Sequence, residues 1–158
     1  MARLVWGSLA GLLVPLLLLV LGAQPASALV TCSVAGSTMT ITLASNDTAT
    51  ISRTVGGTFS VSGSGYGGDP DCVPGAGAAT VTNIARVVIA GDNGPQTVTI
   101  NQANGVFGPG SGVAESTGTS EIEFDVDLGD LLTDDADTLT ILGRPVAETI
   151  VVGSAGVN

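Results

Sequence analysis

The chain has 158 residues and a formal net charge of −10, with 14 acidic side chains against four arginines and no histidine. Residues 29–90 carry three acids and two arginines, a net of −1, whereas residues 91–158 carry eleven acids and one arginine, a net of −10. Phosphate groups would be repelled by the second half. Nucleic-acid binding is therefore excluded, and cations are its natural partners.

The first 28 residues have the features of a secretory signal peptide. Arg3 supplies the positive charge, "LAGLLVPLLLLVLG" (9–22) the apolar stretch, and Ala26-Ser27-Ala28 a small-residue cleavage site. A membrane anchor is the alternative, but the run is shorter than the roughly 20 residues that span a bilayer, and Pro15 interrupts it. We therefore expect cleavage after Ala28 and a secreted, extracellular protein with no membrane attachment. Residues 29–158 are enough for one domain.

Cys32 and Cys72 are the only two cysteines, and both lie in the part expected to be exported. In an oxidising compartment this predicts one disulfide between the new N-terminus and the Gly/Pro-rich segment 63–77. Closing such a loop contributes about 3–4 kcal/mol on the chain-entropy model. A metal or redox pair is the alternative, with little support because the chain has no histidine and no C-x-x-C.

The mature chain consists of short Thr-rich, β-branched runs separated by Gly, Asn, Asp and Pro, which predicts an all-β protein. Nine strands are expected, at 38–43, 48–52, 58–62, 79–83, 86–91, 96–100, 121–129, 137–143 and 148–153. Segments 63–77 and 101–120 are expected to be loops.

Successive runs recur at short intervals. "RVVIAG" (86–91) and "QTVTI" (96–100) start ten residues apart, and "DTLTILG" (137–143) and "ETIVVG" (148–153) eleven apart. This spacing favours a β-solenoid of the parallel β-helix or β-roll kind, in which each strand stacks directly on the next. An immunoglobulin-like β-sandwich is the alternative. The very low aromatic content disfavours it, because a sandwich core normally contains Trp or Tyr.

Four windows partly match the calcium-binding nonapeptide G-G-x-G-x-D-x-U-x, where U is a large aliphatic residue. They are "GDNGPQTVT" (91–99), "LTDDADTLT" (132–140), "GRPVAETIV" (143–151) and "GSAGVN" (153–158). The position of the ligand Asp is occupied by Asp137 in the second window. Gln96, Glu148 and Asn158 occupy it in the others, and each of these side chains also carries an oxygen.

These windows, with "TSEIEFDVDLGD" and the start "CSVAGSTMTITLASNDTATISRTVGG", resemble the leading segment of secreted bacterial proteins of the haemolysin-type (RTX-like) calcium-binding repeats. The resemblance covers most of the mature chain. It implies a β-solenoid, secretion and calcium bound at Gly/Asp corners. Only Asp137 falls on the family's ligand Asp, so these sites are degenerate.

Residues 121–128 alternate four carboxylates with four apolar side chains, which predicts a strand with one acidic face. One interpretation of this face is a solvated acidic surface without a binding role. The functional alternative is that it binds a calcium ion (Ca2+). Calcium takes 6–8 oxygens, and a straight row of side chains cannot surround it, so the following corner must contribute. The predicted metal ligands are Asp127, Asp130, Asp134, Asp135 and Asp137, with an affinity of about 0.1–1 mM.

The sequence thus predicts a secreted calcium-binding module. The alternative is a metal-independent structural or adhesive β-solenoid whose open C-terminal turn contacts another protein end to end, since solenoid ends need caps. Catalysis is not expected, because the usual triads need a histidine, lysine or free cysteine, and a glycosidase would need aromatic platforms for sugar.

Overall fold

The computed structural model describes residues 29–75, 77–114, 121–129 and 136–146, and the backbone of 152–153 and 156–157. The predicted leader and three predicted metal ligands (Asp130, Asp134 and Asp135) lie outside this part. The strands are β1 (Thr31–Ala35), β2 (Thr38–Thr42), β3 (Thr48–Arg53), β4 (Phe59–Gly63), β5 (Arg86–Ala90), β6 (Thr97–Asn101), β7 (Glu123–Asp127), β8 (Thr138–Leu142), β9 (Val152–Gly153) and β10 (Gly156–Val157). One 3-10 turn, η1 (Pro70–Cys72), is the sole helical element described. The all-β prediction is confirmed.

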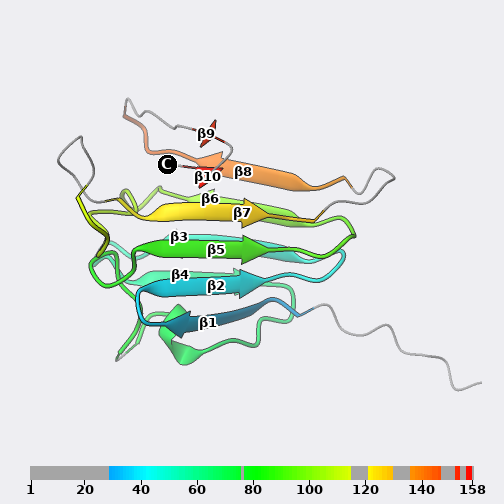
Figure 1. The fold of residues 1–158 in the computed structure, drawn as a ribbon, viewed down its shortest axis with the longest axis horizontal. Helices are drawn as coiled ribbons and strands as arrows, with labels where there is room; N and C mark the ends of the chain where they lie inside the picture. Colours follow the sequence, from blue (N-terminus) through cyan, green and yellow to red (C-terminus); the bar gives the residue numbers. More distant parts are fainter. Residues whose placement is uncertain are drawn as a thin grey trace, which may run out of the picture.

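The strands form two mixed sheets, one in the order β1-β2-β5-β7-β10-β9 and one in the order β4-β3-β6-β8. They lie as two layers, one behind the other (Figure 1). The middle pairs are parallel: β5 pairs with β2 and β7, and β6 pairs with β3 and β8. The chain therefore passes from the first sheet to the second three times, from β2 to β3, from β5 to β6 and from β7 to β8.

Two details of the sequence prediction are wrong. Strands that follow at a ten-residue spacing do not stack on each other, because β5 and β6 belong to different sheets. Segment 79–83 is a turn with a single bridge from Thr80 to Thr58. There the Asn83 side chain accepts a hydrogen bond from Thr80 N at 2.7 Å, which competes with strand pairing. Conversely, β1 was not predicted.

Inward-facing side chains stack in rows between the two sheets. In register, the rows are Met39–Val87–Phe124 and Ile41–Ile89–Val126 in the first sheet, and Ala49–Val98–Leu139 and Ile51–Ile100–Ile141 in the second. The first two members of every row are buried. Each buried aliphatic side chain stabilises the fold by about 1.5–3 kcal/mol, so these rows hold the sheets together.

The three phenylalanines gather at one place in this core. The rings of Phe59 and Phe107 stack with centroids 5.3 Å apart, and Phe124 meets Phe107 edge-on at 5.0 Å. All three side chains are buried. All three phenylalanines are therefore inside the core, where each fills volume that the small aliphatic side chains of the rows do not fill.

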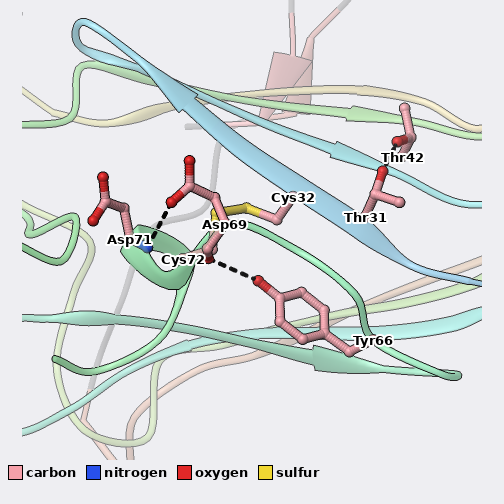
Figure 2. The surroundings of a disulfide bond; sticks show 7 residues. All are labelled: Thr31, Cys32, Thr42, Tyr66, Asp69, Asp71 and Cys72. Atoms are coloured by element: carbon pink, nitrogen blue, oxygen red, sulfur yellow. Dashed lines mark hydrogen bonds between the residues drawn. A yellow bond between two sulfur atoms is a disulfide. The ribbon is translucent and has the colours of Figure 1, made fainter.

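The N-terminal end of the stack is closed. β1 and β4 are the edge strands there, each antiparallel to its neighbour, and η1 contacts both of them. Cys32 on β1 and Cys72 in η1 form the predicted disulfide, with Cα atoms 6.2 Å apart (Figure 2). Both cysteines are buried. The bond therefore fixes η1 across the end of the two sheets.

Hydrogen bonds hold the chain around this disulfide. Asp69 caps η1 by accepting a bond from Asp71 N at 2.9 Å, and Tyr66 Oη donates to the Asp69 carbonyl at 3.4 Å (Figure 2). Burial, and secondarily the charge of Asp69, raise the pKa of Tyr66 above its usual value. These contacts position a glycine-rich segment that has little apolar surface of its own.

Candidate functional site at the corners between the sheets

Three chain segments connect the first sheet to the second: 43–47, 91–96 and 128–137. Because Thr48, Thr97 and Thr138 are in register, the residues just before them are also stacked. These are Asp47, Gln96 and Asp137. The nonapeptide windows had placed Gln96 and Asp137 at the same motif position, and the structure brings them together. Asp47, which begins the similar run "DTAT", was missed.

Backbone and side-chain hydrogen bonds join these three residues. Thr97 N donates to the Asp47 carbonyl and Thr138 N to the Gln96 carbonyl, both at 2.9 Å. The Asp137 carboxylate accepts a bond from Gln96 N at 2.8 Å. Parallel pairing therefore continues past the ends of the strands, and one carboxylate takes part in it.

Asp92 connects two corners in a similar way. One carboxylate oxygen, Oδ2, accepts a bond from Ser45 N in the preceding corner at 2.9 Å. The other, Oδ1, accepts from Gly94 N at 2.9 Å and from Gln96 Nε2 at 2.6 Å. Bonds from N–H groups to a carboxylate contribute about 1.5–3 kcal/mol each. Asp92 is therefore a strong structural link between successive corners.

Two buried oxygens of these corners, Asp47 Oδ1 and Gln96 Oε1, have no hydrogen-bond partner within the described segments. The two side chains are only 1% and 2% exposed. Gln96 Oε1 lies against the backbone of Gly91, where an added Cβ would be 2.5 Å from it and 2.6 Å from the Leu128 carbonyl oxygen. Gly91 is thus required by the close approach of these two oxygens, and the site offers lone pairs to a donor or cation.

The predicted metal ligands are only partly described. Asp127 ends β7 and its Oδ1 accepts a bond from Gly129 N at 3.1 Å, while Asp137 bonds Gln96 as above. These two residues stand at opposite ends of the 128–137 segment. Among the residues that the structure describes, no three acidic or cysteine side chains are grouped closely enough to hold a metal ion.

The acidic strand is as expected from Glu123 onward. Glu123, Asp125 and Asp127 point outward, and Phe124 between them is buried. The charge is partly balanced by the neighbouring strand: Arg86 Nη2 lies 2.9 Å from Glu123 Oε2, and Arg86 Nη1 lies 3.9 Å from Asp125 Oδ2. The hydrogen bond to Glu123 raises the pKa of Arg86. These side chains are 48% exposed, so solvent screens both pairs and they contribute little to stability.

No protein-family model, curated protein or solved structure matches this chain. Within the described ranges, no helix is long and apolar enough to cross a membrane.

Proposed function

We propose that this chain is an exported structural module built as a β-solenoid, with a disulfide-closed N-terminal end and three described coils. The main support is that carboxylates at the corners accept hydrogen bonds from backbone N–H groups of neighbouring coils. Asp92 accepts from Ser45 N, and Asp137 accepts from Gln96 N. A stack joined in this way does not need a metal ion at those corners. Its role is to present flat outer faces and an end surface to partners outside the cell.

Parallel pairing supports a solenoid over an immunoglobulin-like sandwich. Sandwich sheets are antiparallel, whereas β2, β5 and β7 are parallel in one sheet and β3, β6 and β8 in the other. Antiparallel pairing lies at the ends of the stack: β1 with β2 and β4 with β3 at the closed end, and β10 with β7 and β9 at the other end of the first sheet. A chain that alternates between two parallel stacks follows a helical path, which is the defining feature of a solenoid.

Cysteine pairs can test this topology. Residues directly opposite on neighbouring strands have Cα atoms about 5 Å apart, within the range that a disulfide spans. We expect Thr97→Cys/Thr138→Cys and Thr99→Cys/Thr140→Cys each to form a second disulfide, detected by peptide mapping. The diagonal control Thr97→Cys/Thr140→Cys should stay reduced. Antiparallel pairing would allow at most one of the two in-register pairs, which would contradict the solenoid.

The disulfide supports export, since such bonds persist in oxidising compartments.

The last described coil supports an end-to-end contact with another protein. Leu139 is 37% exposed, although its row partners Ala49 and Val98 are fully buried. Exposure of the last described side chain of this apolar row is what we expect if another protein covers that end of the stack.

A calcium-binding module is the second candidate. The 128–137 corner has ten residues against five in 43–47 and six in 91–96, and acidic side chains stand at both of its described ends. Of these acids, Asp137 ends the corner and Asp127 is the β7 residue just before it, and a longer corner offers more oxygens than the other two. Because a ligand that binds only the folded state raises its stability, calcium would raise the melting temperature.

One pair of measurements separates the candidates. For the structural module we expect the same melting midpoint in chelator and in millimolar calcium. For the calcium module, calorimetric titration should give a Kd of about 0.1–1 mM that is lost in Asp135→Asn/Asp137→Asn. Absent heats in both proteins would end the calcium proposal. A calcium-dependent melting midpoint would overturn the metal-independent one.

A further inference from the structure

The outer face of the second sheet carries a regular array of threonines. Thr48, Thr97 and Thr138 are directly opposite one another on β3, β6 and β8, and Thr50, Thr99 and Thr140 form a second in-register row. We call these six residues the threonine face. The members of the first row are exposed, and those of the second are partly exposed.

The hydroxyl groups of the threonine face are free for a ligand. None of the six Oγ1 atoms makes a hydrogen bond to any residue in the described part of the chain. On the other sheet, by contrast, the hydroxyls of Thr31 and Thr42 bond each other. The other outward residues of β3, β6 and β8 are Ser52, Asn101 and Leu142. This outward face is therefore uncharged on a chain of net charge −10.

The array is periodic in two directions. Neighbouring parallel strands are about 4.8 Å apart, and alternate residues of one strand about 6.6 Å apart. Threonine is β-branched and restricted at χ1, so its hydroxyl and methyl group can repeat in one orientation from strand to strand. Each residue then presents one group that exchanges hydrogen bonds with water and one that cannot.

We propose that the threonine face binds the surface of crystalline ice. The absence of charge gives no attraction for ions or nucleic acid, and the three phenylalanines that a sugar could stack on are buried in the core. A rigid two-dimensional array of hydroxyl and methyl groups is best matched by a ligand whose hydrogen-bonding oxygens also form a two-dimensional array. The spacings of the threonine face are close to those between oxygen atoms on faces of ice.

Stacked threonines also stabilise a sheet as cross-strand neighbours, and this alone would place them on outer strands. That role does not explain why the threonine rows are not kept on the other sheet. There the outward residues Thr38, Thr40 and Thr42 of β2 lie opposite Arg86, Val88 and Ala90 of β5. The array is confined to one face, so a binding role and a stabilising role can be separated by comparing faces. The threonine face requires only the pairing of β3, β6 and β8.

The test is ice growth in the presence of the purified protein, with its leader processed by the expression host. We expect a measurable gap between melting and freezing points, faceted crystals, and slowed recrystallisation. Thr99→Tyr, at the centre of the face, and Thr50→Tyr should lose all three effects, since a ring lifts the array from the ice while preserving strand preference. Thr40→Tyr, on the outer face of the other sheet, should keep them.

Circular dichroism and melting temperature identify any variant that fails to fold, and the remaining variant of the threonine face then decides the result. Wild-type protein that neither shapes ice nor slows its recrystallisation would overturn the proposal. Equal loss in folded Thr40→Tyr and Thr99→Tyr would do so too. Binding to crystalline chitin or cellulose without any effect on ice would assign the face to a different solid and would also overturn it.

Discussion

The two sheets of this protein have similar inner sides and very different outer sides. Inside, both contribute rows of buried aliphatic residues, such as Ile41–Ile89 in one sheet and Ile51–Ile100 in the other. Outside, the first sheet carries Arg86 beside the carboxylates of β7, while the second carries the threonine face. Strand alternation lets these two sides vary independently.

The difference separates what makes the fold from what makes a binding surface. An inward change alters packing between the sheets, and its cost should be similar on either sheet. An outward change should have little effect on stability and should alter only the face on which it lies.

The first prediction compares the inner sides directly. Ile89→Ala and Ile100→Ala remove equivalent buried side chains from opposite sheets. Each should lower the free energy of unfolding by about 2–5 kcal/mol, because lost burial and a remaining cavity add together. Urea unfolding monitored by circular dichroism gives both values. A clear loss for one variant with none for the other would mean that the sheets do not share one core.

The second prediction concerns the end where both sheets are closed. Cys32→Ser/Cys72→Ser should lower the free energy of unfolding by about 2–4 kcal/mol, because the disulfide limits the unfolded chain and fixes η1 against β1 and β4. Thermal unfolding of the variant and of the oxidised wild type measures the loss. The ice-growth effects of the folded variant should remain at a temperature well below its melting midpoint, since the threonine face is not part of this end.

The third prediction addresses the corners that connect the faces. Asp92→Ala leaves Ser45 N and Gly94 N without their acceptor, while Gln96 Nε2 loses its 2.6 Å bond to the carboxylate and keeps the Asp92 carbonyl at 3.3 Å. We expect a loss of about 2 kcal/mol, well below the sum of three bonds to a charged group, because water can reach the exposed donor and Gln96 Nε2 keeps one acceptor. Asp69→Ala, which removes one bond at the closed end, is the matched control and should cost less. An unaffected Asp92→Ala protein would remove the support for metal-independent stacking.

Local patterns in the sequence predicted most of the strands and the carboxylate alternation in β7, because both depend on neighbours along the chain. The disulfide was also predictable, since the chain holds only two cysteines. The turn at 79–83 was not, because the Thr-rich run there is strand-like and only the Asn83 side chain breaks it. β1, an edge strand that pairs with β2, has the sequence TCSVA and lacks the Thr-aliphatic alternation of the strands that were predicted, so its own residues gave a weak signal.

The pairing of the parallel strands could not be predicted from a fixed period. Thr48 and Thr97 are 49 positions apart, whereas Thr97 and Thr138 are 41 apart, because the segments between paired strands differ in length. The motif windows still aligned Gln96 with Asp137, since each precedes a Thr-aliphatic-Thr run. The threonine face itself was missed because the strands were expected to stack at ten-residue spacing, which would have mixed the two outer sides.

The smallest effect should come from the charged outer side. Glu123→Gln removes the closer partner of Arg86 but keeps a side chain of the same shape, and Arg86 still has Asp125 within 3.9 Å. With both partners 48% exposed, the change in the free energy of unfolding should be small and should shrink further in high salt. Chemical unfolding at low and high salt measures it, with Glu121→Gln, an exposed acid just before β7, as the control. A loss of several kcal/mol would show that the charged side contributes to the fold, and the separation of inner and outer roles would then fail for this sheet.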